Sequence, residues 1–451
     1  MKELRGLTIC EGCDAVFAHP RLARREVACC TRCGTELERH RGDLQRVILP
    51  LTVASLILFA IANLFPIVKI ELQGLSSQTT LVGAVIVLAG EGLSPVALLV
   101  LLTTLLFPLV QLSILCYLLV PLQRGRRAPG FSVLVRMLQS LRPWGMIEVF
   151  LLGILVAIVK LTAFATVIAG PALWAFAALT VLLTQVVSFN PRVFWEIAFD
   201  PVEGLEIEGE VDGEGDGKAE GRRDGRAALE AQAAPAQPAH AHAGPWITAA
   251  GLGLRECHHC GCVWSGAQDG DACGRCGTRL RLRKPDSIRR TWALLIAAAI
   301  MYLPANLLPV MITQSLLGTE QDTIMSGIIF FWVSGSYGLA ALIFTASFLV
   351  PLFKLAALFL LAVLAQQRSD WRRHDRARLY RLLEVIGRWS MLDVFVVSLL
   401  AGLVRLQGFA EITAAAGIAA FASVVILTML SSLAFDPRLT WQGANTSRTD
   451  P

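Results

Sequence analysis

Long apolar runs separated by short polar segments dominate this chain of 451 residues. The runs cover residues 47–68, 95–121, 144–169 and 172–189 in the first half, and 292–312, 337–365, 390–412 and 414–433 in the second. A helix needs about 20 apolar residues to cross the hydrocarbon core of a bilayer, so each run is long enough to span it. The pattern predicts an all-α polytopic membrane protein with about four transmembrane helices in each half.

Shorter segments complete the pattern in both halves. Two apolar pieces, 81–89 and 324–333, precede the second run of each half and are too short to cross, so we expect them to be interfacial or re-entrant. Segment 69–78 is polar and is expected to be a loop, and Pro108 is expected to kink its span.

The second half of the chain repeats the first. Segments 63–66, 107–112, 144–150 and 155–161 match segments 306–309, 350–355, 389–395 and 400–406, at an offset of 243 to 245 residues. An F-D-P sequence at 199–201 is matched by another at 435–437. Four spans per copy would return the chain to the same side, so we predict two tandem repeats of parallel orientation.

Polar segments divide the chain into domains. Residues 1–46 and 246–290 hold most of the cysteines and each precedes a membrane unit, unit 1 at 47–200 and unit 2 at 291–436. Residues 201–245 are rich in Glu, Asp and Gly and then in Ala and Pro, so a disordered linker is expected there. A polar tail, 437–451, follows unit 2.

Composition and charge support a membrane location. The chain is 55% hydrophobic and 17% charged, whereas soluble domains have about 25% charged residues. Lys and Arg concentrate in segments 1–46, 123–143 and 366–388. The positive-inside rule therefore places both termini and both cysteine-containing domains in the cytoplasm.

Eight of the eleven cysteines form two pairs of C-x-x-C sequences. They are Cys10, Cys13, Cys30 and Cys33 in the first domain, and Cys257, Cys260, Cys273 and Cys276 in the second. Two such turns supply four thiolates, so each domain is predicted to be a small zinc ribbon of short β hairpins with a closed, structural metal site. Iron would fit the same geometry, and a thiol redox pair or a degenerate ribbon is the alternative.

Several polar residues fall inside the predicted spans, where charge is costly. They are Glu148, Lys160, Lys354, Asp393 and Arg405, with Asn63 and Asn306 beside helix-breaking prolines. Side chains near the span ends can extend to the interface, which is one interpretation of Glu148, Lys160, Asp393 and Arg405. The other is a polar network that lines a cavity between helices, and the central position of Lys354 favours it.

Other classes of protein are disfavoured by the sequence. The predicted spans contain no histidine that could hold haem, and neither a Walker A sequence nor a G-x-S-x-G nucleophile motif occurs. Zinc ribbons often bind nucleic acid, but the few aromatic residues and the membrane tether argue against that use here. We therefore expect a protein that is not an enzyme and does not bind nucleic acid.

The doubled motifs resemble those of the paraquat-inducible protein A family. These motifs are the C-x-x-C ribbons, N-L-x-P, P-L-x-K/Q-L, W-x-M-x-E/D-V-F and F-D-P. The resemblance covers nearly the whole chain except the linker. This sequence departs from the pattern in its long linker, in the twelve residues between the turns of the second ribbon, and in Gln111, which stands opposite Lys354.

The resemblance implies a function in lipid transport. It implies a bacterial inner-membrane protein that passes phospholipid or another lipophilic molecule to or from a periplasmic tunnel protein of the MCE family, with membrane lipids as its other partners. A proton-coupled transporter of small solutes that uses the same polar residues is the first alternative. A membrane scaffold with regulatory zinc ribbons is the second.

Overall fold

The computed structural model describes most of the chain. The described residues are 1–20, 22, 26–39, 44–72, 75–90, 94–162, 166–187, 191–199, 246–315, 318–367, 373–389, 391, 394–396, 398–399, 405–406 and 410–441. The predicted linker at 201–245, Asp393 and most of the predicted span at 390–412 lie outside these ranges.

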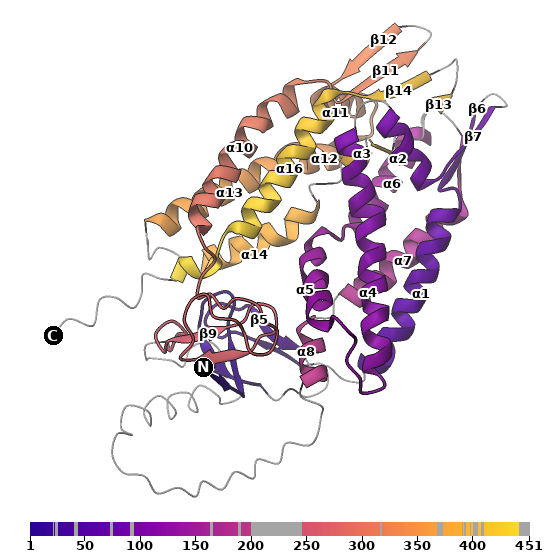
Figure 1. The fold of residues 1–451 in the computed structure, drawn as a ribbon. Coiled ribbons are helices and arrows are strands. Elements are labelled where there is room, and N and C mark those ends of the chain that lie inside the picture. The colour runs from indigo at the N-terminus through magenta and orange to yellow at the C-terminus, as the bar shows by residue number, and fades with distance from the viewer. Residues whose placement is uncertain are drawn as a thin grey trace, which may run out of the picture.

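Unit 1 is a helical bundle capped at one end by a small sheet (Figure 1). Its elements are α1 (Leu44–Leu64), β6 (Val68–Leu72), β7 (Leu75–Thr79), α2 (Leu81–Gly90), α3 (Ser94–Val100), the π-helix η1 (Leu101–Leu106), α4 (Phe107–Leu122), α5 (Phe131–Leu141), the 3₁₀ turn η2 (Arg142–Trp144), α6 (Ile147–Thr162), β8 (Thr166–Ala169), α7 (Pro171–Val187) and α8 (Arg192–Phe199).

Unit 2 follows the same order of elements where it is described, with the added strand β13 and a 3₁₀ helix in place of α8. They are α10 (Ser287–Leu307), β11 (Met311–Ser315), β12 (Gly318–Asp322), α11 (Ile324–Val333), α12 (Tyr337–Ile343), the π-helix η3 (Phe344–Leu349), α13 (Val350–Gln366), α14 (Arg373–Trp389), β13 (Arg405–Leu406), β14 (Ala410–Ala414), α16 (Ala416–Ala434) and the 3₁₀ helix η4 (Pro437–Trp441). The last of these was assigned to the tail in the sequence-based division.

The predicted fold class is confirmed, and several spans begin or end at other residues than predicted. Within the described residues, six helical stretches are long and apolar enough to cross a membrane: Val47–Leu64, Ser94–Leu122, Phe131–Val159, Ser287–Leu307, Ala340–Gln366 and Ala416–Ala434. Helix α7, where a span was predicted, is apolar but shorter. The predicted short pieces at 81–89 and 324–333 form α2 and α11.

The predicted polar loop at 69–78 is wrong, because this segment forms a β hairpin. Strand β6 pairs antiparallel with both β7 and β8, and in unit 2 the order is β12-β11-β14-β13. Lys69 and Glu71 alternate with apolar residues in β6, which is the period of two that a strand requires. Apolar residues at the ends of four predicted spans therefore belong to strands, so that α1 ends at Leu64 and α6 at Thr162.

Each unit has a π-helical turn at the same place in its second span. The turns η1 and η3 end two residues before Pro108 and Pro351, which lack the N–H that a regular helix would use. The hydroxyl groups of Thr103 and Thr104 in η1 donate to the carbonyl oxygens of Leu99 and Val100 at the end of α3. The expected kink at Pro108 thus takes the form of a widened turn.

The two units share one apolar core. Phe150 of unit 1 and Phe395 of unit 2 are both fully buried, and both belong to the largest buried cluster. Ile154 and Val156 of unit 1 lie in the same cluster as Phe421 of unit 2. The ribbons pack together at the end opposite the sheets (Figure 1), so the polar and apolar parts of the protein are segregated along its length.

Candidate metal centres and membrane polar residues

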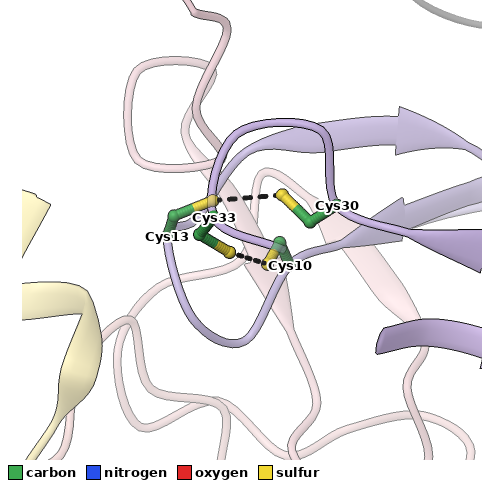
Figure 2. A group of neighbouring side chains, drawn as sticks. All are labelled: Cys10, Cys13, Cys30 and Cys33. Atoms are coloured by element: carbon green, nitrogen blue, oxygen red, sulfur yellow. Dashed lines mark hydrogen bonds between the residues drawn. The ribbon is translucent and has the colours of Figure 1, made fainter. Parts of the chain in front are cut away.

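Ribbon 1, the domain before unit 1, brings its four predicted ligands together at the tips of two hairpins. Cys10 and Cys13 lie in the turn between β2 (Leu7–Ile9) and β3 (Val16–Ala18), and Cys30 and Cys33 lie between β4 (Val27–Cys29) and β5 (Glu36–Arg39). The Sγ atoms of Cys10 and Cys33 are 3.4 Å apart, and those of Cys13 and Cys30 are 3.5 Å apart (Figure 2).

Ribbon 2, the domain before unit 2, repeats this arrangement. Its strands β9 (Leu254–Glu256) and β10 (Val263–Ser265) flank the first turn. The Sγ atoms of Cys257 and Cys276 are 3.3 Å apart, and those of Cys260 and Cys273 are 3.6 Å apart. Gly261 and Gly277 follow the two turns at φ +75° and φ +72°, a conformation that glycine adopts without strain.

Both clusters fit a tetrahedral metal ion. A Zn–S bond of about 2.3 Å corresponds to about 3.8 Å between sulfur atoms, slightly more than the separations observed. All eight thiols are buried, and the ligand atoms of each cluster lie within 4.8 Å of one another. Hydrogen bonds from neighbouring thiols act in both directions: those of Cys10 and Cys257 lower the pKa of Cys33 and Cys273 and raise the pKa of Cys13 and Cys260. Each cluster could therefore hold a metal ion on thiolates.

The remaining cysteines lie outside both clusters. Cys29, adjacent to a ligand in the sequence, is exposed at the end of β4, and Cys116 is half-buried in α4. Cys262 is buried in ribbon 2 but does not belong to its four-sulfur cluster. The structure therefore brings together the eight cysteines of the C-x-x-C sequences and leaves the other three apart from them.

Each ribbon docks on the membrane unit of the other half. Trp441 and Ala377 of unit 2 pack on ribbon 1, and Arg381 of α14 donates to the carbonyl oxygens of Cys33 and Gly34 at 3.0 and 2.7 Å. Ribbon 2 instead packs on unit 1, where the side-chain amide of Gln139 in α5 donates to the carbonyl oxygen of His259 at 2.7 Å. Ribbon 1 therefore packs on unit 2 and ribbon 2 packs on unit 1. We refer to this exchange as the crossing of ribbons and units.

The repeat motif at the end of each unit differs from the one expected. Segment 189–195 reads F-N-P-R-V-F-W and segment 435–441 reads F-D-P-R-L-T-W, at an offset of 246 residues. Pro191 and Pro437 both directly precede or begin a short helix, whereas F-D-P at 199–201 ends α8. Arg192 and Arg438 are thus equivalent residues that the earlier match overlooked, and a search for the longer motif would have found them.

Lys354 and its counterpart Gln111 are both buried in their spans. Lys354 is 1% exposed, and its Nζ donates to the carbonyl oxygen of Gly387 at 3.4 Å. Gln111 is 3% exposed and borders a cavity of about 30 Å³ together with Leu138 and Arg142. Among the described residues, neither atom of the Gln111 amide has a hydrogen-bond partner.

The other predicted polar residues are dispersed. Glu148 begins α6 and is exposed, and its Oε1 accepts a hydrogen bond from Thr184 at 2.7 Å. Asn63 and Asn306 donate to carbonyl oxygens four residues back in their own helices. Lys160 and Arg405 lie in α6 and β13, but their side chains, like Asp393, fall outside what the structure describes.

Thr184 was missed because hydroxyl residues are common in apolar helices. Matches on either side of it, at offsets of 245 and 246 residues, align Thr184 of α7 with Met429 or Leu430 of α16. The repeat register therefore does not mark this threonine, and only its contact with Glu148 in the folded protein does.

A mostly apolar cavity lies between the two units. It has a volume of about 90 Å³ and is bordered by Val156 of α6 and by residues of unit 2. These include Met311, Asp322, Ile324, Phe331, Ser347 and Phe421. The cavity therefore lies at the sheet end of the interface, with Asp322 as its charged wall residue.

Two ribbons and two copies of one apolar helical unit define a duplicated multi-pass membrane protein. The family model for paraquat-inducible protein A matches residues 44–198 and 288–445. This chain belongs to that family, as its motifs indicated.

Curated relatives cover almost the whole chain. It is 34% identical to "Intermembrane transport protein PqiA" of Escherichia coli (strain K12) over 96% of its own length and 95% of that protein. It is 29% identical to "Lipophilic envelope-spanning tunnel protein A" of the same strain, over 96% of this chain and 90% of the other. A "Probable intermembrane transport protein" of Haemophilus influenzae shares 38% identity over 38% of this chain and 41% of its own. No solved structure matches the chain significantly.

Proposed function

We propose that this protein is the inner-membrane component of a system that moves phospholipid or another lipophilic molecule between membranes. In this role it passes lipid to or from a periplasmic tunnel protein of the MCE family and is not itself an enzyme. The printed names of its relatives, which refer to intermembrane transport and to a lipophilic envelope-spanning tunnel, support the proposal.

The observation that carries the proposal is the cavity between the units. Its wall is made mainly of aliphatic and aromatic side chains such as Val156, Ile324 and Phe331, which suit an acyl chain better than a small polar solute. It lies at the sheet end of the interface, away from the ribbons. With the ribbons and both termini in the cytoplasm, as the distribution of Lys and Arg predicts, this end faces the periplasm and a tunnel partner.

The ribbons have a structural role in this proposal. Each cluster holds one zinc ion, because four buried thiolates form a closed site with no position for a substrate. Bound metal would keep the hairpin turns of each ribbon folded. Lys354 and the other polar residues of the spans would take part in lipid movement. The charge of Lys354 distinguishes unit 2 from unit 1, which has Gln111 at the equivalent position.

A photo-crosslinking experiment tests the lipid proposal. A photoreactive phenylalanine replaces Phe331, which is 6% exposed in the cavity wall, in protein that has been washed extensively in detergent. The matched control places the same residue at the neighbouring Phe330, which is 52% exposed on the outside of α11. We expect mass spectrometry to find phospholipid attached at position 331 well above position 330.

Two results would count against lipid transport. Equal crosslinking at the two positions would mean that the cavity retains no lipid beyond the surrounding bilayer. Saturable binding of a small polar solute in the cavity, without lipid, would favour the proton-coupled transporter. A second arm places the photoreactive group at the exposed Thr319 of β12 in cells, where capture of an MCE protein is expected.

A further inference from the structure

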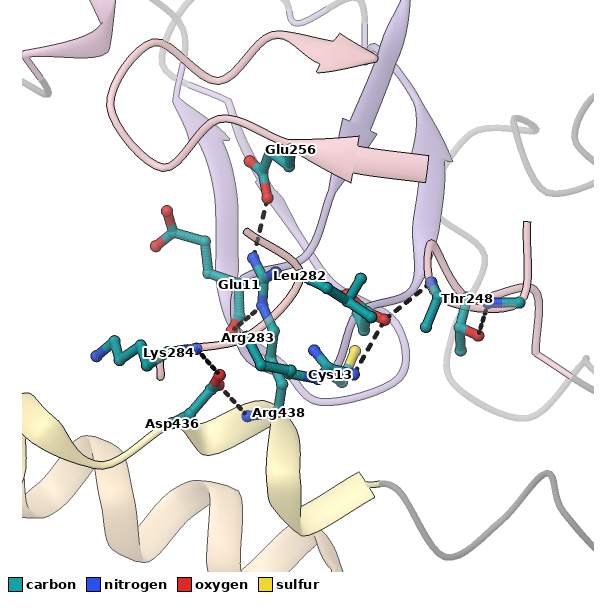
Figure 3. Close-up of polar contacts among 12 residues, drawn as sticks. Glu11, Cys13, Thr248, Glu256, Leu282, Arg283, Lys284, Asp436 and Arg438 are labelled. Atoms are coloured by element: carbon teal, nitrogen blue, oxygen red, sulfur yellow. Dashed lines mark hydrogen bonds and ion pairs between the residues drawn. The ribbon is translucent and has the colours of Figure 1, made fainter. Parts of the chain in front are cut away.

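Equivalent arginines from the two membrane units converge on one carboxylate of ribbon 2. Arg192 of unit 1 donates from Nη1 to Oε1 of Glu256 at 3.3 Å. Arg438 of unit 2 donates from Nη2 to Oε2 of the same residue at 2.9 Å (Figure 3). Glu256 therefore bridges the two halves of the membrane domain with its two oxygens.

The same arginines also hold ribbon 1. Arg192 forms an ion pair with the carboxylate of Glu11, and Arg438 donates from Nε to the carbonyl oxygen of Glu11 at 3.2 Å. Nη1 of Arg438 lies 3.6 Å from Oδ1 of Asp14. Each arginine thus contacts both ribbons, and the two ribbons together contact both units.

The centre of the convergence is buried. Arg438 is 4% exposed, Glu256 5% and Asp14 2%, whereas Arg192 is half-buried and Glu11 is exposed at the edge. Water cannot replace a lost partner in the buried centre, so a charge there that loses its counter-charge is strongly disfavoured. Arg438, Glu256 and Asp14 therefore stabilise the arrangement only together.

The carboxylates are positioned by the cysteine turns. Glu11 lies between Cys10 and Cys13, Asp14 follows Cys13, and Glu256 precedes Cys257. The ribbons are also joined directly, since strand β1 (Lys2–Leu4) pairs with β10 of ribbon 2 and Arg283 lies 3.3 Å from Asp14. A change in either metal cluster would therefore move acidic groups that bind both units.

We propose that the paired ribbons form a metal-dependent clasp, in which Glu256, Glu11 and Asp14 hold Arg192 and Arg438 and thereby keep the two membrane units together at the ribbon end. This inference rests on the proposed metal loading of the clusters. With both ions present the clasp is closed. Loss of either ion loosens its carboxylates and lets the units separate at this end, so that metal supply regulates the relative position of the units.

A distance measurement between the units tests the clasp in the full-length protein. Azide-bearing amino acids replace Val133 of α5 and Val385 of α14, which are 57% and 54% exposed, and carry spin labels that do not react with cysteine. In metal-loaded protein we expect one narrow distance distribution. Chelation should give a broader distribution with a longer mean, and adding zinc back should restore the first.

Variants separate the ion from the ion pairs. Cys30→Ser with Cys33→Ser removes one cluster and should broaden the distribution. Glu256→Gln should also broaden it while metal content stays unchanged. Asp269→Asn, which breaks the exposed pair with Arg255 inside ribbon 2, is the matched control and should have no effect. Size-exclusion chromatography and circular dichroism verify that each variant is folded.

The outcomes distinguish failure of the clasp from failure of the metal assignment on which it rests. If the purified protein contains no metal, both the metal assignment and the clasp are wrong. If chelation removes metal but leaves the distances unchanged, the metal sites stand and the clasp is wrong. If Glu256→Gln alone leaves the distances unchanged, the units are held by packing, and the proposed role of the converging arginines is overturned.

Discussion

The ring of Phe150 meets the ring of Phe395 edge to face, with centroids 5.4 Å apart and planes at 89°. The two residues occupy the same position in the two repeats. When equivalent residues touch each other, the surfaces that contain them are related by an approximate two-fold axis, as in an isologous dimer. The two membrane units therefore face each other as the subunits of a homodimer would.

Removing either ring should destabilise this interface. Truncation of a buried Phe typically costs about 3–5 kcal/mol, so Phe150→Ala and Phe395→Ala are each expected to lower the midpoint of thermal unfolding in detergent markedly. The double variant should lose less than the sum, with a coupling of about 0.5–1.5 kcal/mol for the ring pair. Trp174→Ala, at a site 71% exposed, is the control and should have a small effect. Strict additivity would contradict the contact.

Replacement of Gln111 should be tolerated or should stabilise the protein. A buried amide without partners costs about 1–3 kcal/mol, and a leucine of similar size removes that cost. We expect Gln111→Leu to raise the midpoint of thermal unfolding. Gln139→Leu, which loses the hydrogen bond to His259, is the control and should lower that midpoint. A destabilised Gln111→Leu variant would instead indicate bound water in the 30 Å³ cavity.

Replacement of Lys354 should separate folding from transport. Lys354→Gln gives unit 2 the residue that unit 1 has at the equivalent position, where Gln111 is buried in the folded protein. We expect near-normal thermal unfolding and a strong loss of lipid crosslinking at Phe331 or of lipid transfer to the tunnel partner. Normal transfer would remove Lys354 from the proposed network.

Elemental analysis of variants should show that the two clusters bind zinc independently of each other. Cys33→Ser is expected to reduce the zinc content, measured by elemental analysis, from about two ions per chain to about one, because three thiolates hold the ion less firmly. Cys29→Ser, which changes an exposed thiol in the same ribbon, should leave the content unchanged. Unaltered zinc in the Cys33→Ser protein would refute the ligand assignment, and iron in place of zinc would correct the ion.

Thiol labelling in cells tests the orientation. A maleimide that does not cross membranes should react with exposed Cys29 only after spheroplasts are permeabilised, because ribbon 1 is predicted to lie in the cytoplasm. Thr319→Cys on β12, at the opposite end of the protein, should react in intact spheroplasts. The reverse order would invert the topology and the proposed direction of partner docking.

Local patterns sufficed for the ribbons and for most of the spans. The C-x-x-C spacing identified all eight clustered cysteines, since a tetrahedral ion constrains the residues near it in sequence. The strands at the sheet end were missed at β6, β8, β11 and β14 because apolar residues such as Val68 and Val167 fit a helix and a strand equally well by hydrophobicity alone.

Contacts between distant parts of the chain were beyond the sequence. Nothing near Glu256 in the sequence indicates that Arg192 and Arg438 meet there, because those residues are 64 and 182 positions away. The crossing of ribbons and units is likewise a property of packing. Repeat register could have supplied one clue, since the arginines share the F-N/D-P-R-x-x-W motif.

That crossing also sets an order of events during synthesis. Ribbon 1 is synthesised long before Trp441 and Arg381, the residues of the second half on which it packs. Domains generally fold in the order in which they emerge. Ribbon 1 therefore stays undocked, with its four cysteines already synthesised, until the second half has been inserted and provides its binding surface. A chain truncated within unit 2 would lack that binding surface.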